Sequence, residues 1–564
     1  MDQTLTLTLL GSGLALATLP RILRRLQLSR AKHPSLTGHA RMARRVSRLI
    51  PYYAYDERRF FDCDGAPAEI AAERRASFDH LARTLARRHA RTVEMTRAAA
   101  QDISDLQFTG RYRVPFQFSA YVREHLSLGA FLSESDGVTV TDLDGRQFID
   151  LTGAYGVNLF GTDFYKRCIR EGARRVEALG PVLGSYHPCV AWNAAELKRI
   201  SGLDEVSFHM SGTEAVMQAV RLARYHTGRK RIVRFSGAYH GWWDDVQPGP
   251  GNPLAPGHTY TLRDMSERTL HVLRTRRDIA CVLVNPLQAL HANAAAPGDS
   301  TLVDGSRRAG FDRAAYTEWL QQLRQVCTDR GIVLILDEVF VGFRLAAGGA
   351  QAYFGVQADL VTYGKTLGGG LPVGVLCGRA ALMRRFREDR PADICFARGT
   401  FNSHPYVMGA MQVFLEHLST PEVEALYGDL DARWNQRREA LNQRLAEAGA
   451  PVRLEGIGTI WTVTYTQPGR YHWMLQYYLR AQGLALSWVG TGRLIFNLAF
   501  ADADFERVVD RFVAAVHAMR EGGWWWAPRD ADHRSIRRVV LGEILARRLG
   551  RPGAGAADQP AGRP

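Results

Sequence analysis

The sequence predicts an α/β fold, with a mainly parallel, doubly wound sheet over residues 151–412 and a smaller α+β domain over residues 413–527. Three observations lead to this prediction. Strand-like and helix-like runs alternate through the first range, as they do where helices cover both faces of a parallel sheet. The second range begins with helix-like sequence and ends with strand-like runs at residues 456–463 and 494–498. The chain of 564 residues, 46% of them hydrophobic and 23% charged, is also long and apolar enough for more than one packed core.

The rest of the chain divides into four further segments. Residues 1–34 form an apolar and basic leader, residues 35–112 an arginine-rich region with helical periodicity, and residues 528–564 a basic amphipathic helix with a disordered end rich in Gly, Ala and Pro. Residues 113–150 are expected to join the smaller domain. They should contain a β-hairpin, because Asp144-Gly145 is a strong signal for a tight turn between two strands.

A candidate phosphate site follows a strand-like run at residues 205–210 and coincides with the start of a predicted helix. The free amide groups and the positive dipole end of a helix attract a dianion, and glycine lets the backbone approach it closely. Gly212 and Thr213 are therefore candidate phosphate donors. The same residues also fit an ordinary helix start in which Ser211 is the cap and Glu214 completes a capping box.

The next strand-like run, residues 231–235, leads into an aromatic turn at residues 236–243. Tyr239 in this turn is a candidate for stacking on a flat ring, an arrangement that contributes about 1 kcal/mol beyond area burial. The alternative is that these aromatic side chains fill a crevice between domains.

An acid and a lysine follow two later strands. Asp337 comes directly after the apolar run of residues 332–336, which has the length and branching of a buried parallel strand, and Lys365 stands in the glycine-rich run of residues 364–370. Pyridoxal phosphate chemistry needs a lysine that holds the aldehyde as a Schiff base and a carboxylate that keeps the pyridine ring protonated. Taken singly, Asp337 also fits a helix cap and Lys365 a solvated loop lysine.

Lys365 also invites comparison with a nucleotide-binding P-loop, since it lies in Gly364-Lys365-Thr366. That motif requires a glycine five positions before the Gly-Lys pair, where Asp359 stands in this chain. A carboxylate there would repel a phosphate. The spacing therefore argues against a nucleotide kinase or an ATPase.

Several of these runs together resemble class III aminotransferases. The motifs that carry the resemblance are Ser211–Ala215, Ala238–Gly241, Leu336–Val339 with Gly342–Arg344, and Gly364–Gly370. Gly348–Gln351, Tyr353–Val356 and Leu371–Gly374 are in addition similar to the glutamate-1-semialdehyde aminomutase branch of that class. The resemblance extends from about residue 115 to about residue 525.

The resemblance implies a pyridoxal 5'-phosphate (PLP) enzyme of the PLP-dependent transferase fold type I, with the cofactor in the large domain over residues 151–412. In such an enzyme Lys365 would be the covalent attachment point of the cofactor and a proton carrier, and Asp337 would hold the pyridine nitrogen. The other residues with an implied cofactor contact are Gly212, Thr213, Tyr239, Val339 and Thr400.

The implied contacts divide the site between two protomers. Gly212 and Thr213 would bind the phosphate, and Val339 and Tyr239 would lie on opposite faces of the ring. Thr400 matches the place where the family's dimer partner reaches across to the same phosphate. The resemblance therefore implies a homodimer with a shared active site.

Two departures from the aminomutase pattern leave the reaction open. The family's usual Glu-Pro is Asn285-Pro286 here, and residues 401–405 read Phe-Asn-Ser-His-Pro where the aminomutases have Ser-Gly-Asn-Pro. We expect an aminotransferase that moves an amino group from a small-molecule amino donor to a carbonyl acceptor, which is lipid-like or carrier-tethered. The alternative is a 2,1-aminomutase of the glutamate-1-semialdehyde type, and a further alternative is a non-catalytic, membrane-associated binding protein that retains the fold.

The cysteines favour a reducing compartment. There are seven, an odd number, and no two form a Cys-x-x-Cys pair, which argues against structural disulfides and against a zinc site. We therefore expect a cytoplasmic protein with no metal in its site.

Both ends of the chain suggest a membrane surface. The apolar run Leu5–Leu19 is followed by arginines and lacks a basic segment before it, so it fits a short anchor on the cytoplasmic face better than a cleaved signal. Near the other end, Ile536, Val540 and Ile544 share one face of a basic helix, which suits either a lipid interface or packing on the protein's own surface.

The formal net charge of +15 agrees with an anionic lipid surface or an acidic acyl carrier protein. It agrees with nucleic acid as well. No nucleic-acid-binding motif accompanies the basic residues, so no nucleic-acid partner is expected.

Overall fold

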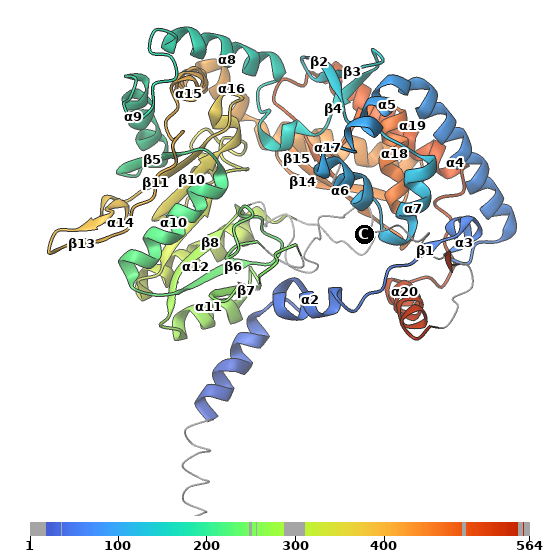
Figure 1. Cartoon of the computed structure of the whole chain (residues 1–564), viewed down its shortest axis with the longest axis horizontal. Helices are drawn as coiled ribbons and strands as arrows, with labels where there is room; N and C mark the ends of the chain where they lie inside the picture. The colour runs from blue at the N-terminus through green and yellow to red at the C-terminus, as the bar shows by residue number, and fades with distance from the viewer. Residues whose placement is uncertain are drawn as a thin grey trace, which may run out of the picture.

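The computed structural model describes residues 19–34, 36–247, 251–254, 256–286, 311–487, 492–550 and 556–557. The chain folds into two lobes (Figure 1). The large lobe, residues 153–428, surrounds a seven-stranded sheet, and the small lobe combines residues 53–150 with residues 430–526. Each lobe has its own apolar core.

The large sheet has the strand order β5-β11-β10-β9-β8-β6-β7. β11 runs antiparallel to both of its neighbours, and the other strands share one direction. The mainly parallel α/β sheet predicted from the sequence is therefore confirmed. The strands are β5 (Glu205–His209), β6 (Arg231–Phe235), β7 (Thr259–Leu262), β8 (Ile279–Val284), β9 (Val333–Asp337), β10 (Leu360–Gly364) and β11 (Gly374–Gly378).

Both faces of this sheet are buried, which explains why its strands are continuously apolar. In β9, Leu334 and Leu336 belong to the larger core, whereas Val333 and Ile335 belong to a second core shared with α10 (Gly212–Thr227). Side chains alternate along a strand, so Asp337 is expected on the face that carries α10.

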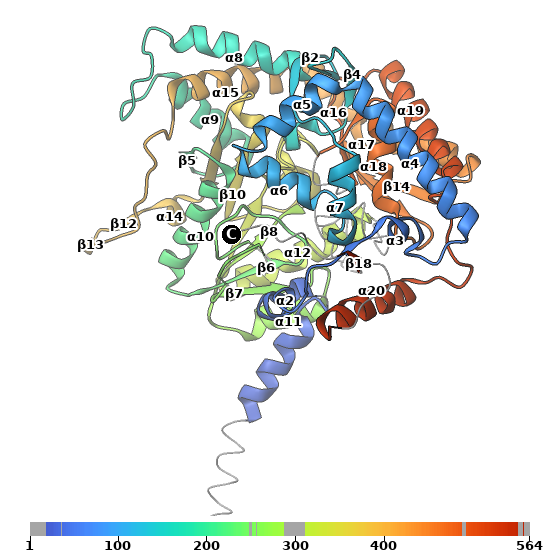
Figure 2. The same ribbon diagram turned by 45° about the vertical axis from the view of Figure 1, so that its right-hand side comes forward.

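Helices of the large lobe cover the two faces of the sheet. Their bounds are α8 (Thr162–Val176), α9 (Cys189–Ser201), α11 (Glu267–Thr275), α12 (Arg313–Arg330), α13 (Gly349–Phe354), α14 (Ala380–Met383), α15 (Pro405–Leu418) and α16 (Pro421–Gly428). Between α14 and α15 a two-stranded hairpin projects from the body of the molecule (Figures 1 and 2). Its strands are β12 (Phe386–Arg387) and β13 (Arg390–Ile394).

The small lobe contains two short sheets. One has the order β16-β4-β3-β2 and the other β14-β15-β17. The predicted hairpin is confirmed, because β3 and β4 pair antiparallel across a turn in which Gly145 has a φ of 72°. The elements are β2 (Leu132–Asp136), β3 (Thr139–Asp142), β4 (Gln147–Asp150), α17 (Leu430–Glu447), β14 (Val452–Ile457), β15 (Ile460–Tyr465), α18 (Leu475–Ala481), β16 (Leu484–Ala485), β17 (Arg493–Ile495) and α19 (Asp502–Glu521).

The N-terminal region is helical, as predicted, and much of it packs on the small lobe. Phe60, Phe78 and Phe118 are buried in the same core as Tyr471 and Trp473. Phe118 lies with its ring centroid 5.1 Å from that of Trp473. The elements are α2 (Ala40–Ser47), β1 (Ala54–Tyr55), α3 (Glu57–Asp62), α4 (Ala68–Arg88), α5 (Ala90–Ala99), α6 (Ser104–Tyr112) and α7 (Phe116–His125). β1 pairs antiparallel with β18 (Ala556–Ala557).

One buried arginine joins the two lobes. Arg344, fully buried, donates from Nη1 to Thr459 Oγ1 at 3.2 Å and to the Phe496 carbonyl at 3.0 Å. From Nη2 it donates to the carbonyls of Gly156, at 3.2 Å, and Asn158, at 2.6 Å. Burial lowers the pKa of Arg344 to about 10, so the group remains a cation at neutral pH.

The two chain ends carry further helices. Residues 19–31 form a helix that projects away from the lobes, and α20 (His533–Arg548) lies on the same side of the molecule (Figures 1 and 2). The predicted anchor lies outside the described residues except for Leu19. Within the part of the chain that the structure describes, no helix combines the length and apolarity needed to cross a membrane.

The structure decides between the two interpretations of one face of α20. Ile536, Val540 and Ile544 are half-buried, and Ile544 packs against the core of the small lobe. This face therefore packs on the protein's own surface and does not form a lipid interface.

Candidate active site

The predicted acid lies at the end of β9, where three groups donate to it. Asp337 is 3% exposed, and its Oδ1 accepts from the Val339 amide at 3.1 Å and from Thr362 Oγ1 at 3.2 Å. Its Oδ2 lies 2.7 Å from Nδ1 of His240. A carboxylate offers about four lone-pair directions, so a carboxylate with these three donors has room for one more.

His240 is a site residue whose role the sequence did not reveal. Because an ionised carboxylate can only accept, Nδ1–H of His240 donates to Asp337, and the opposite ring nitrogen, Nε2, is buried without a hydrogen-bond partner. The contact spans 97 positions of the chain. The only signal in the sequence was the position of His240 next to Tyr239, in the turn after β6.

Lys365 follows β10 and begins a short 3₁₀ turn, Lys365–Gly368. Its φ of 49° lies in the left-handed region, which a non-glycine residue seldom adopts. Its Nζ lies 5.4 Å from the ring centroid of Phe340. The turn is also held by a hydrogen bond between the hydroxyls of Thr366 and Tyr165.

The environment of Lys365 favours the neutral amine. Burial lowers its pKa to about 8, the guanidinium groups of Arg344 and Arg493 act in the same direction, and the negative charge of Asp337 opposes them. At pH 7 an amine with this pKa is about 10% neutral, compared with about 0.03% for an ordinary solvated lysine. The neutral form is the one that attacks an aldehyde.

Covalent attachment of an aldehyde at Lys365 is expected to accelerate with pH. The rate should rise as the pH passes through about 8 and level off above it, because the fraction of neutral amine rises in that range. Borohydride trapping of the apo-protein mixed with PLP at a series of pH values measures this rate. A rate that still climbs steeply at pH 10 would show that the amine titrates as an ordinary lysine.

The predicted phosphate site lies at the start of α10. Ser211 is the N-cap, its hydroxyl accepts from the Glu214 amide at 3.3 Å, and its carbonyl accepts from the Ala215 amide at 3.1 Å. The serine cap is thus confirmed but the capping box is not, because the Glu214 carboxylate accepts from the Met210 amide at 3.0 Å instead of from the Ser211 amide. The cap leaves the amides of Gly212 and Thr213 at the end of the helix. A helix N-terminus with such amides can hold a phosphate.

Glycines bring the predicted residues into close contact. A Cβ on Gly212 would lie 2.5 Å from Val339 Cγ1, and one on Gly241 would lie 2.4 Å from Thr213 Oγ1. A Cβ on Gly364, next to Lys365, would lie 3.2 Å from Val339 Cγ1. The start of α10, the end of β9 and the lysine turn are therefore neighbours.

A Gly212→Ala substitution is expected to weaken PLP binding by about tenfold or more. The added methyl group would overlap with Val339 and push the start of α10 away from it, and overpacking of this kind costs about 1–3 kcal/mol. Equilibrium dialysis of the variant against PLP measures the loss. Gly257→Ala is the matched control, since nothing lies within 4 Å of its added Cβ.

Two predicted residues are placed differently from these. The Tyr239 side chain is 59% exposed, and its carbonyl accepts from Asn285 Nδ2 at 3.2 Å. Thr400 is exposed in the segment that follows β13, which belongs to the projecting hairpin. These contacts thus join Asp337, Lys365, Val339, Gly212 and Thr213 in one site, and the turn that carries Tyr239 adjoins it through His240, whereas Thr400 belongs to the exposed segment after the hairpin.

The residues present fit PLP. The glycine contacts form a narrow cradle beside Val339, the end of α10 offers two amides to a phosphate, and Asp337 has room for one further donor such as a pyridinium N–H. Lys365 is a nucleophilic amine close to the same cradle. An enzyme of fold type I that uses PLP is the class that this fold and site define.

The comparison with known families agrees. The class-III aminotransferase family matches residues 120–516, which is more than half of the chain. The chain belongs to this family of PLP-dependent enzymes, and it has the mixed α/β fold type I.

The proteins to which this chain is similar include an aminomutase and two transaminases. A glutamate-1-semialdehyde 2,1-aminomutase from Desulfotalea psychrophila is 32% identical over 376 residues, which cover 63% of this chain and 80% of the relative. Among solved structures, a transaminase with PLP bound is 26% identical with a TM-score of 0.58, covering 70% of this chain and 92% of its own. A β-phenylalanine aminotransferase from Variovorax paradoxus has a TM-score of 0.64 at 24% identity, covers 79% and 98%, and shows the fold alone.

Proposed function

We propose that this protein is an aminotransferase that moves an amino group from a small-molecule amino donor to a carbonyl acceptor. The observation that carries the proposal is the buried pair of Asp337 and His240 close to a lysine whose pKa is lowered to about 8. A class III aminotransferase needs both an anchored acid and an amine that is neutral near physiological pH. Family membership supports an enzyme over a non-catalytic binding protein.

Each residue of the site has a proposed role. PLP supplies the electron sink for the charge left when a Cα–H bond is cleaved. Lys365 would bind it covalently and would hold and move a proton at Nζ, which the pKa lowered by burial makes possible at neutral pH. Asp337 keeps the pyridine nitrogen protonated, and His240 orients that carboxylate through its 2.7 Å contact.

The remaining proposed contacts position the cofactor. The amides of Gly212 and Thr213 hold the phosphate at the start of α10, and Val339 supports one face of the ring. Tyr239, whose side chain is exposed in the turn next to His240, would stack on the opposite face. Thr400 reaches the phosphate of a second protomer, so that the enzyme is a homodimer with a shared site.

The acceptor is proposed to be lipid-like or carrier-tethered, and the enzyme to act at the cytoplasmic face of a membrane. A 2,1-aminomutase reaction is the second candidate, and the relative from Desulfotalea psychrophila favours it. Asn285, which lies 7% exposed at the end of β8 where the aminomutase pattern has an acid, argues against it.

Dependence on an external amine distinguishes the two candidates. Purified protein with PLP is offered single amines while the cofactor absorbance is followed, and long-chain and short aldehydes are then supplied with and without the best donor. Amination of an aldehyde only when the donor is present supports the aminotransferase. Rearrangement of glutamate-1-semialdehyde without any donor would identify the aminomutase, and no spectral response to any amine would refute both.

A further inference from the structure

We propose that the helix of residues 19–31, α2 and α20 together form a docking face for an anionic lipid surface. This inference concerns where the protein binds, and it goes beyond the proposed reaction. The three helices lie along one side of the molecule in both views (Figures 1 and 2). Each combines exposed apolar side chains with arginines.

The helix of residues 19–31 has an uncovered apolar stripe. Its exposed large apolar side chains are Leu19, Ile22, Leu23 and Leu26, each between 48% and 53% exposed. These positions are spaced i, i+3, i+4 and i+7, so they share one face of the helix. An apolar stripe of this kind on a projecting helix indicates a surface that covers it.

The base of this helix is fixed to the large lobe. Lys32 forms an antiparallel bridge with Leu262 at the end of β7, and the Arg263 amide donates to the Ala31 carbonyl at 3.0 Å. Arg276 donates to the Arg24 carbonyl at 3.2 Å. The exposed stripe is therefore held in a defined position relative to the body. In the sequence, the apolar run that begins at Leu5 leads directly into it.

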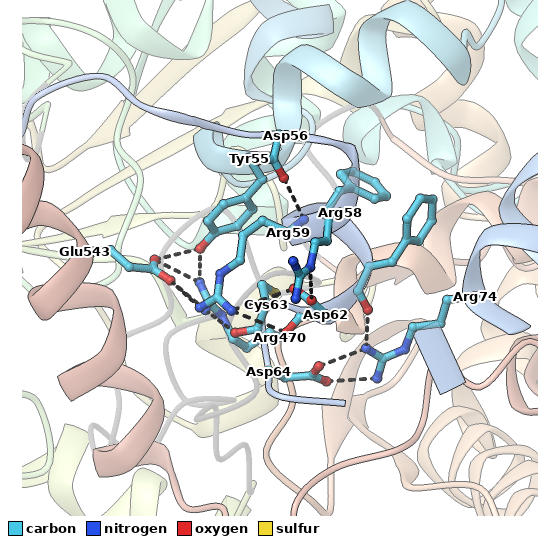
Figure 3. A network of polar contacts seen from close by, with 12 residues as sticks. Tyr55, Asp56, Arg58, Arg59, Asp62, Cys63, Asp64, Arg74, Arg470 and Glu543 are labelled. Carbon is cyan, nitrogen blue, oxygen red and sulfur yellow. Dashed lines mark hydrogen bonds and ion pairs between the residues drawn. The ribbon is translucent and has the colours of Figure 1, made fainter. Parts of the chain in front are cut away.

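α20 is held to the body by its single acid (Figure 3). Glu543 accepts from the hydroxyls of Tyr53, at 3.0 Å, and Tyr55, at 2.6 Å, and forms ion pairs with Arg59 and Arg470, each at 3.2 Å. Arg470 is 9% exposed, and these groups lower the pKa of Glu543 despite its partial burial. The side of α20 that carries Glu543 is thus committed to the protein.

The same contacts turn a second apolar stripe of α20 outward. Leu541, Leu545 and Leu549, four residues apart from one another, are 58%, 56% and 67% exposed. Arg548 at the end of α20 donates to the Leu49 carbonyl at 2.8 Å, which joins α20 to the residues that follow α2. Leu49 itself is 51% exposed. Exposed leucines of α20 and of the α2 segment therefore lie on adjoining elements.

Charge identifies the occupant of this face. Residues 19–50 contain nine arginines and lysines and no acid, and α20 contains five arginines and one acid, the engaged Glu543. Two such faces would repel one another, which argues against a second copy of the chain. Nucleic acid offers no apolar phase for the leucine stripes. An anionic bilayer offers both an apolar interior and negative headgroups, as basic amphipathic helices require.

Vesicle flotation of the full-length protein with PLP tests the proposal. Binding is expected to vesicles of phosphatidylcholine mixed with phosphatidylglycerol, to be much weaker with phosphatidylcholine alone, and to be reduced in 1 M salt, where the screening length is about 3 Å. No substrate is present in this assay. Its failure is therefore distinguishable from failure of the proposed reaction.

Two variants separate charge from apolar contact. Arg21→Gln, Arg25→Gln and Arg45→Gln together should weaken binding by about 100-fold, because each cation near an anionic surface contributes a factor of about 5. Ile22→Ser, Leu26→Ser and Leu545→Ser together should cause a loss of similar size. Burying about half of a leucine or isoleucine side chain in lipid contributes a comparable factor to the binding constant. These side chains are exposed, so the fold is expected to be retained.

The matched control is Arg83→Gln, Arg87→Gln and Arg91→Gln together, which removes three exposed cations from α4 and α5, outside the three helices. It should bind vesicles as the wild type does. If the control lost as much vesicle binding as the charge variant, binding would depend on net charge alone, and the proposed docking face would be overturned. Absence of wild-type binding to the anionic vesicles would overturn the proposal outright. So would binding of an acidic acyl carrier protein that the Arg21, Arg25 and Arg45 variant abolishes while vesicle binding persists.

Discussion

Replacement of Lys365 by alanine is expected to lower turnover by about 10⁴-fold. A positioned acid–base group contributes up to about this factor, and in the proposed mechanism the same amine also binds the cofactor covalently. The neutral amine is available because burial lowers its pKa to about 8. Turnover with the best amino donor measures the effect, and borohydride reduction followed by mass spectrometry should place the pyridoxyl adduct of the wild type at position 365.

Two substitutions control this experiment. Lys365→Arg keeps a positive charge but cannot supply a neutral amine, so it should be as inactive as the alanine variant. Lys198→Ala removes an exposed lysine from the last turn of α9 and should leave turnover unchanged. A Lys365→Ala enzyme that works within tenfold of the wild type, or an adduct at another lysine, would disprove the assignment.

Asp337→Asn is expected to lower turnover by about 10³-fold while the protein stays folded. The amide has nearly the same shape, but it removes the negative charge that His240 Nδ1 approaches at 2.7 Å and that would keep a pyridine nitrogen protonated. Losses of about 10²–10³-fold are typical when one preorganised electrostatic group is removed from an active site. Turnover under saturating donor, together with retained covalent cofactor, separates this loss from unfolding.

Thr362→Val is the matched substitution for Asp337. It deletes one hydrogen bond to the same carboxylate, the 3.2 Å contact from Thr362 Oγ1, and leaves the charge in place. A single neutral hydrogen bond contributes about 0.5–1.5 kcal/mol, so a loss of about tenfold at most is expected. If Thr362→Val were as damaging as Asp337→Asn, the role of the acid would be to position its neighbours rather than to supply a charge.

The sequence predicted the parts of the site that lie at strand ends. Asp337 and Lys365 each follow an apolar run of strand length, and in a parallel sheet such ends lie along one edge. Thr362 was not predicted, because its place beside Asp337 follows from the register of β10 against β9, which the sequence does not give. The contact of His240 with Asp337 could not be predicted either, because no local sequence pattern indicates a contact between residues 97 positions apart.

The packing of the terminal segments could not be predicted from the sequence for a different reason. Periodicity shows that a helix has an apolar face, but it does not say what covers that face. The aromatic side chains of α3, α4 and α7 are covered by residues about 400 positions later, as the hydrogen bond from Tyr471 to the Phe60 carbonyl illustrates. α20 has two apolar stripes, and the packing of Ile544 together with the partners of Glu543 reveals which of them faces the protein.

The arginine between the two lobes limits how this enzyme can open. If the lobes moved apart, Arg344 would lose its hydrogen bonds either to Thr459 and Phe496 or to Gly156 and Asn158. A buried guanidinium without these hydrogen-bond partners costs several kcal/mol, about 3–5 for a buried charge that loses its partner. A hinge between the lobes is therefore disfavoured throughout the catalytic cycle. The exposed turn that carries Tyr239 does not depend on these Arg344 contacts, so a movement of that turn would leave the junction between the lobes intact.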